Sequence, residues 1–263
     1  MRNYSKMLNS KQRIKIFNGG FDMSDERLIV ALDFNKFSDV KNLINELGDD
    51  VVFYKVGMEL FYSEGEKVVY WLKEQNKKVF LDLKLCDIPN TVAGGLCSLM
   101  KLGADILNVH AVGGFEMMEA GILSLRAESE RLQIPCPKLI AITVLTSMDQ
   151  SDWDGLGYGN IDMTQQALHL AKLAQFAGLD GVVSSPQEAK AIRQECGKDF
   201  LIVTPGIRPI GSDIDDQSRV SLPSYAIENG SNYLVVGRPI RSAENPLQAA
   251  RNILEEIKNV GNV

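Results

Sequence analysis

The chain has 263 residues, of which 45% are hydrophobic and 24% are charged, close to the averages for soluble globular proteins. This length allows one large domain or two small ones, each with a substantial core. Its formal net charge of -6 argues against a general basic surface for nucleic acids or anionic membranes, so any phosphate site must be a local group of donors.

The first 22 residues are basic and polar, and they lack the apolar core of a secretory signal. Met23 stands just before the first strand-like segment, so residues 1–22 are expected to be a disordered N-terminal extension or a mis-assigned start. Their Lys and Arg content leaves a mitochondrial presequence as an alternative. We expect residues 23–263 to form the folded domain.

From residue 27 onward, short runs rich in β-branched and other apolar residues alternate with helical patterns. The runs predict eight strands, at 27–33, 50–57, 77–84, 104–110, 137–146, 180–185, 199–206 and 231–238. Amphipathic patterns after all but the seventh predict helices at 39–47, 66–75, 91–103, 115–130, 163–178, 186–196 and 245–258. A long polar loop follows the seventh strand.

This alternation of strands and helices predicts a parallel sheet with right-handed crossovers. Eight units without a linker-like segment between them fit a single-domain (β/α)8 TIM barrel in size and rhythm. An open doubly wound sheet is the alternative, and it would be expected to carry a Gly-rich turn after the first strand. The sequence there, ALDFNKFSD, contains no G-x-G-x-x-G.

Ionisable residues mark the ends of the first three predicted strands. Asp33 ends the first strand, Lys55 lies on the second, and the third carries Asp82 and Lys84, with Asp87 in the following loop. A lone ionised side chain in a buried strand is costly unless it is paired. Asp82 and Lys84 are two residues apart, so strand alternation places them on the same side. Because barrels collect function at the carboxyl ends of their strands, we expect Asp82, Lys84 and Lys55 to pair over a pocket.

Two arginines follow the last two predicted strands, where barrels of this kind often bind phosphate. Gly237 permits a close backbone approach near a helix N-terminus, and Arg238 can add a bidentate contact to a phosphate. Arg208 follows the seventh strand, and an ordinary loop arginine is the alternative for both. The polar stretch 205–220 predicts either a disordered segment or an active-site lid, from which Gln217 could close over a phosphate.

The histidines and cysteines carry weaker signals. His110 ends the fourth strand together with Asn108, and a hydrogen-bonded core histidine is its preferred interpretation; His169 falls in a helix and is given no role. The sequence has no H-x-H, H-E-x-x-H or C-x-x-C arrangement that would favour a metal site. The cysteines predict reduced thiols of a cytoplasmic protein; they are Cys86, Cys97, Cys136 and Cys196. No apolar run is long enough to span a bilayer.

Taken together, these segments resemble the orotidine 5′-phosphate decarboxylase family. The resemblance covers almost the whole chain after residue 27 and keeps its order, and its most specific pieces are FLDLKLCDIPNTV and VVGRPI. The matching segments are residues 29–34, 53–61, 80–92, 108–114, 143–147, 205–209, 216–220 and 235–240.

The resemblance implies decarboxylation of orotidine 5′-monophosphate to UMP and CO2 in de novo pyrimidine synthesis, with no cofactor and no metal. It implies that Lys84 donates a proton to pyrimidine C6 and that Asp82 lies near the departing carboxylate. Lys55 and Asp87 would complete a Lys-Asp-Lys-Asp array of alternating charges. It also implies a homodimer in which Asp87 and Thr91 reach into the neighbouring subunit's site.

The resemblance also implies contacts to each part of the substrate. Asp33 and Lys55 would contact the ribose hydroxyls, while Thr146 and Ser147 would lie near the base. The phosphate would be bound by Arg208, Gln217, Gly237 and Arg238.

Two other functions stay open. A magnesium-dependent sugar-phosphate decarboxylase or synthase of the same suprafamily would share the D-x-K-x-x-D strand, but with an acidic residue where this chain has Lys55. A cation at that position opposes metal binding. A non-catalytic barrel that binds a phosphate ligand would be expected to lack a member of the charge array, and none is missing.

Overall fold

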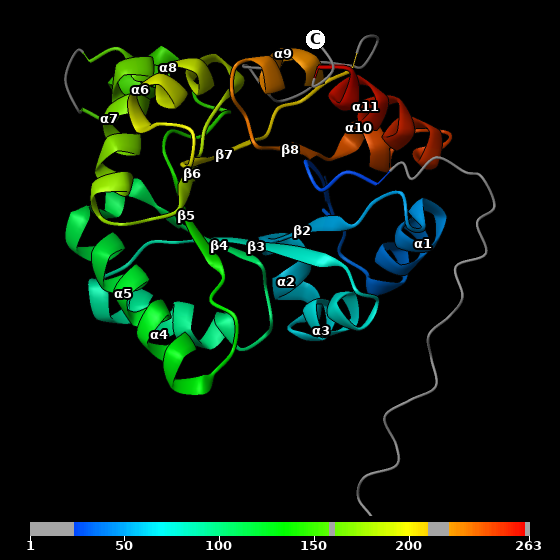
Figure 1. Ribbon diagram of the computed structural model, residues 1–263, viewed down its shortest axis with the longest axis horizontal. Helices are drawn as coiled ribbons and strands as arrows, with labels where there is room; N and C mark the ends of the chain where they lie inside the picture. Colours follow the sequence, from blue (N-terminus) through cyan, green and yellow to red (C-terminus); the bar gives the residue numbers. More distant parts are fainter. Residues whose placement is uncertain (1–23, 158–160, 210–220, 261–263) are drawn as a thin grey trace, which may run out of the picture.

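The computed structural model of the chain describes residues 24–157, 161–209 and 221–260. Eight parallel strands follow one another in chain order, and the eighth pairs back to the first to close a barrel (Figure 1). The predicted (β/α)8 barrel is confirmed. The strands are β1 (Leu28–Ala31), β2 (Phe53–Gly57), β3 (Lys78–Leu85), β4 (Ile106–His110), β5 (Lys138–Ile142), β6 (Gly181–Val183), β7 (Leu201–Thr204) and β8 (Tyr233–Val236).

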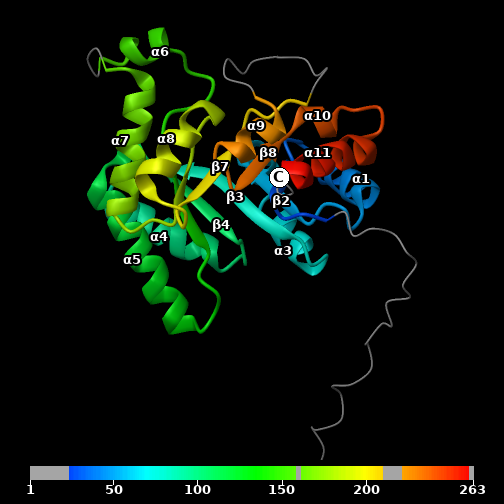
Figure 2. The ribbon, with the colours of Figure 1, turned by 45° about the horizontal axis from the view of Figure 1, so that its top comes forward.

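Helices surround the barrel, with α4, α5, α7 and α8 on one side and α1, α3 and α11 on the other (Figures 1 and 2). Within the described residues, none of them has the length and apolar character needed to cross a membrane. Their bounds are α1 (Phe37–Leu47), α2 (Met58–Glu64), α3 (Lys67–Glu74), α4 (Pro89–Met100), the 3-10 helix η1 (Ala111–Gly113), α5 (Phe115–Leu132), α6 (Gln150–Gly155), α7 (Met163–Phe176), α8 (Pro186–Cys196), α9 (Pro223–Glu228), α10 (Arg238–Arg241) and α11 (Pro246–Val260).

The seven predicted helices correspond to α1, α3, α4, α5, α7, α8 and α11, whereas the shorter α2, α6, α9 and α10 were not predicted. The prediction that the fifth strand extends to residue 146 is wrong, because β5 ends at Ile142 and a loop follows. The predicted domain boundary between residues 22 and 23, and the predicted disorder of 1–22, lie outside the described residues.

Alternate side chains of each strand belong to two separate apolar clusters. On β1, Ile29 and Ala31 face the barrel interior, while Leu28 and Val30 join the layer between strands and helices. The interior cluster draws on all eight strands; it comprises Ile29, Ala31, Phe53, Phe80, Ile106, Ile140, Ile142, Val183, Val203 and Val235. This packed interior closes the barrel from below, so polar side chains at the carboxyl ends stand on an apolar floor.

Candidate active site

A cavity of about 240 Å³ opens at the carboxyl ends of the strands. Its floor and one wall are apolar and include Phe80, Ile142 and Val183. It brings together eight of the twelve site residues expected from the sequence: Asp33, Lys55, Asp82, Lys84, Thr146, Arg208, Gly237 and Arg238.

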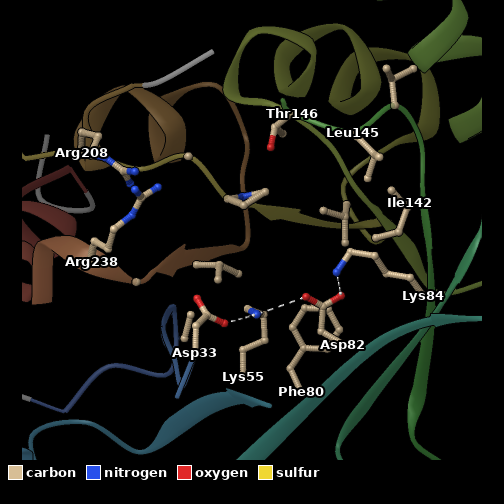
Figure 3. A pocket seen from close by; sticks show the side chains of 17 residues that line it. Asp33, Lys55, Phe80, Asp82, Lys84, Ile142, Leu145, Thr146, Arg208 and Arg238 are labelled. Atoms are coloured by element: carbon tan, nitrogen blue, oxygen red, sulfur yellow. Dashed lines mark hydrogen bonds and ion pairs between the residues drawn. The ribbon is translucent and has the colours of Figure 1, made fainter. Parts of the chain in front are cut away.

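Four of these side chains form a continuous row of alternating charge along one side of the cavity (Figure 3). Lys55 Nζ lies 3.1 Å from Asp33 Oδ1 and 3.3 Å from Asp82 Oδ2. Lys84 Nζ donates to Asp82 Oδ1 at 2.7 Å. Asp82 is therefore held between two ammonium groups, one on each carboxylate oxygen, and the expected pairing of Asp82 with Lys84 and Lys55 is present.

Burial and charge act in opposite directions on the two innermost members of the row. Burial alone raises the pKa of Asp82, but the charges of Lys55 and Lys84, with hydrogen bonds from Lys84 and Asn108, bring that pKa below its ordinary value. For Lys55, burial lowers the pKa, while Asp82 and Asp33 raise it above its ordinary value. Asp82 therefore stays an anion and Lys55 a cation throughout the neutral pH range.

The backbone of β3 departs from regular strand geometry where it reaches the cavity. Leu81 pairs with Leu107 on β4, and the next paired residue of β3 is Leu85, opposite Val109. An advance of four residues along β3 therefore matches an advance of only two along β4, which is a bulge in β3. Within this bulge, Lys84 takes a left-handed backbone conformation with φ of 54°. This conformation is costly for a residue with a side chain. Simple strand alternation therefore does not explain why Lys84 and Asp82 meet; the bulge also positions the Lys84 side chain.

The arginines occupy a separate part of the cavity. Figure 3 shows Arg208 and Arg238 pointing toward each other, while Thr146 lies across the cavity from the charged row. Arg208 is only 8% exposed, and Gly237 forms the N-cap of α10, which begins at Arg238. A Cβ atom on Gly237 would lie 3.5 Å from Asp33 Oδ2, an ordinary contact, so glycine here leaves room above Asp33.

Three of the remaining expected site residues, Asp87, Thr91 and Ser147, do not line this cavity. Asp87 and Thr91 are exposed at the end of the β3–α4 loop and in the first turn of α4, and the Asp87 carboxylate accepts the Ile88 N–H at 2.6 Å. Ser147 is exposed in the loop after β5. Gln217 lies outside the described residues.

Two residues near the row were not expected to belong to the site. Asn108, in the middle of β4, is 2% exposed, and its side chain contacts both Asp82 and the backbone of Lys84. A Cβ atom on Gly57 would lie 3.0 Å from Lys55 Nζ. For Asn108, the only signal in the sequence was a polar residue near the end of a predicted apolar strand. Nothing in the sequence pointed to Gly57.

The donor set around the row does not suit a divalent cation. In the part of the chain that the structure describes, no group of three or more histidine, cysteine or acidic side chains is arranged to hold a metal ion. The Lys55 ammonium stands between Asp33 and Asp82, where it neutralises the oxygens that a hard cation would need.

Comparison with known proteins shows the family of the chain. The model of the Orotidine 5′-phosphate decarboxylase / HUMPS family matches residues 26–253. The chain belongs to this family.

Relatives named for orotidine 5′-phosphate decarboxylase share much of the sequence. The protein of that name from Moorella thermoacetica is 46% identical over 235 residues, which cover 89% of this chain and 93% of the relative. The one from Enterococcus faecalis is 46% identical over 232 residues, covering 88% and 98%. The crystal structure of the Lactobacillus acidophilus orotidine 5′-phosphate decarboxylase has 42% identity and a TM-score of 0.77, covering 89% of this chain and 99% of that one. The resemblance found in the sequence is thereby confirmed.

Proposed function

We propose that this protein is a cytoplasmic enzyme that decarboxylates orotidine 5′-monophosphate to UMP and CO2, without a metal or organic cofactor. The observation that supports this most directly is the Asp82 carboxylate held between the Lys55 and Lys84 ammonium groups at the mouth of an apolar barrel interior. Family membership supports the same reaction, because the relatives named above carry the name of this activity.

In the proposed reaction, the bond between C6 of the pyrimidine and its carboxylate breaks, and its electron pair remains on C6. The Lys84 ammonium stabilises this charge and then transfers a proton to C6, so UMP forms and CO2 leaves. A fixed cation in a water-poor site stabilises such charge far more than a cation in water does. Asp82 would repel the substrate carboxylate, a ground-state effect that adds to the driving force.

Apolar side chains next to Lys84 suit the product CO2. Ile142 and Leu145 lie on the same side of the cavity as Lys84 (Figure 3), and Val183 adds to this surface. An apolar surface does not retain the uncharged product CO2, whereas a cation would retain a carboxylate. The surface also keeps water away from C6 while charge develops there.

The phosphate would occupy the other part of the cavity, with Arg208 and Arg238 as its charge-assisted donors. Gly237 would let the phosphate approach the backbone, and Gln217 would close over it. Asp33 and Lys55 would contact the ribose hydroxyls, with Thr146 and Ser147 near the base. Phosphate binding far from C6 would supply the energy that holds the reacting group against Asp82.

A second candidate is a magnesium-dependent sugar-phosphate enzyme, since the family description includes HUMPS and the D-x-K-x-x-D strand is shared. The position of Lys55 between two carboxylates speaks against it.

The deciding experiment follows the loss of orotate-type absorbance when purified protein is mixed with orotidine 5′-monophosphate in excess EDTA. We expect full turnover in EDTA. Activity that EDTA abolishes and magnesium restores would favour the sugar-phosphate enzyme. UMP binding without turnover would indicate a non-catalytic phosphate-binding barrel.

A further inference from the structure

Asn108 lies beneath the charged row with its side chain shielded from solvent. Its Nδ2 donates to Asp82 Oδ1 at 2.6 Å, and its Oδ1 accepts the backbone N–H of Lys84 at 2.8 Å. One amide group thus contacts the carboxylate of one member of the row and the backbone of another. Both contacts cross from β4 to β3 at the bulge.

The contact to Lys84 replaces a missing strand bond. Regular pairing of β3 with β4 stops after Leu81 and resumes at Leu85, so the Lys84 N–H has left the ladder. A backbone N–H that is shielded from solvent needs a partner, and the side-chain Oδ1 of Asn108 provides one for this partly buried group. This hydrogen bond holds Lys84 in its left-handed conformation, which directs its side chain back to Asp82.

The contact to Asp82 fixes the rotation of its carboxylate. Oδ1 receives both Lys84 Nζ and Asn108 Nδ2, which leaves Oδ2 facing Lys55. Without the amide, Oδ1 would have a single donor on a flexible lysine chain, and the carboxylate could turn. An asparagine is suited to this place because it donates and accepts at once without adding charge.

We propose that Asn108 is a positioning residue that sets the Lys84 ammonium and the Asp82 carboxylate in their reactive arrangement. The inference rests on the proposed function for its effect on turnover, but its structural part does not. Asn108 acts through Asp82 and Lys84 and does not line the cavity.

The first test is Asn108→Leu, which removes both contacts while keeping similar volume. We expect kcat to fall about a hundredfold, as a displacement of about 1 Å does at a reacting centre. KM should change less than about threefold, because the arginines that bind phosphate are untouched. A kcat within about threefold of wild type would overturn the proposal.

The second test, Asn108→Asp, separates positioning from folding. It keeps the acceptor for the Lys84 N–H but loses the donor to Asp82 and places two carboxylates in contact. Such a pair shares one proton at low pH, and the shared proton restores the missing hydrogen bond. The kcat of this variant, divided by that of wild type, should therefore rise about tenfold between pH 8 and pH 5. A ratio that does not change with pH would contradict the proposal.

Other charged groups face this pair, and dividing by the wild-type kcat removes the part of their pH dependence that the two proteins share. From β3 and β2 these are Lys84 and Lys55, and from β4 it is His110, whose pKa is held below its ordinary value by burial and by Lys84, against the opposing effect of Asp82. Asp33 faces Lys55. All four are present in both proteins.

Asn232 offers a matched control at the opposite end of the barrel. Its Oδ1 accepts the backbone N–H of Ile202 at 2.8 Å and a bond from Arg193 at 2.6 Å, so it also joins two strands beside a charged group. Asn232→Leu should lower the melting temperature, whereas Asn232→Asp keeps both acceptor contacts and should not; both variants should leave kcat and its pH profile unchanged. If the Asn232 variants lost as much kcat as the Asn108 variants, the loss would reflect a general effect on the barrel, and the proposal would be overturned.

A crystal structure of Asn108→Leu tests the arrangement without using activity. We expect Lys84 to leave the left-handed conformation and its ammonium to move away from Asp82. An unchanged Lys84 would overturn the proposal even if the wild-type protein did not act on orotidine 5′-monophosphate. Failure of wild-type turnover alone would instead overturn the proposed function.

Discussion

At the scale of single residues, Asp82 shows why a charged group can stand at the end of a buried strand. The residue is 6% exposed, and its carboxylate receives hydrogen bonds from Lys84 and Asn108 as well as the charge of Lys55. Burying an ion pair costs several kcal/mol per ion, which good geometry offsets only in part. Such a cluster is weak evidence for stability, so its place in the cavity is better explained by a role in the proposed reaction.

Lys84→Ala is the sharpest single-residue prediction. We expect kcat to fall by at least about 10³-fold, because Lys84 is both the proposed proton donor and the proposed cation beside C6. The affinity for UMP should change less than about tenfold, since the arginine part of the cavity is intact. Single-turnover kinetics and calorimetric UMP titration measure the two quantities.

Lys138→Ala is the matched control for that variant. Lys138 pairs with Asp180 at 2.8 Å at the start of β5, with a half-exposed side chain. Its removal breaks a lysine–aspartate pair far from the cavity, where such pairs contribute about 0–1 kcal/mol. It should leave kcat unchanged. Near-normal turnover by Lys84→Ala would refute the role assigned to that lysine.

At the scale of elements, the sequence carries the number, order and type of the strands. Apolar runs and helical periodicity repeat eight times, and this repetition suffices to predict a barrel. The residue types at the strand ends also predicted that Lys55, Asp82 and Lys84 would pair, whereas the contact of Asp33 with Lys55 was not predicted. The bulge in β3 could not be predicted, because it depends on the register against β4 and on the Asn108 contact. The periodicity of one strand's sequence carries no information on the register against a neighbouring strand or on a contact such as that of Asn108.

Strand β2 gives a second feature that only the structure reveals, and it can be tested. Gly57 follows Lys55 by two residues, and a Cβ there would come within 3.0 Å of Lys55 Nζ and 3.5 Å of Asp33 Oδ1. Its φ of -92° suits any residue, so Gly57→Ala adds no backbone strain. The flexible end of Lys55 must then shift. We expect kcat/KM to fall about tenfold while the melting temperature stays equal or rises slightly.

Steady-state kinetics and thermal unfolding of Gly57→Ala measure these two effects. Gly155→Ala on α6 is the control, because a Cβ atom there would meet nothing within 4 Å. It should leave kcat/KM unchanged. A large drop in the melting temperature of Gly57→Ala would show that the crowding strains the barrel rather than displacing Lys55.

At the scale of the whole molecule, the chain supplies three members of the proposed Lys-Asp-Lys-Asp array to its own cavity and holds the fourth away from it. Asp87 is exposed, and its neighbour Ile88 is 68% exposed despite being apolar. Thr91 lies on the same exposed segment at the start of α4. This placement supports the homodimer that the family resemblance implies, in which Asp87 and Thr91 would complete the site of the partner, because a symmetric interface would supply the fourth charge to both sites at once.

Mixing two inactive variants tests that assembly directly. Suppose that Lys84→Ala and Asp87→Asn subunits are unfolded together, mixed in equal amounts and refolded. In a mixed dimer, one site then carries both substitutions and the other carries neither. Random pairing makes half of the dimers mixed, so about a quarter of all sites should regain wild-type turnover. The measured activity should be proportional to the fraction of mixed dimers separated by a charge tag. If each site used the Asp87 of its own chain, every site in the mixture would contain one substitution. Mixing would then restore nothing, and the shared site would be refuted.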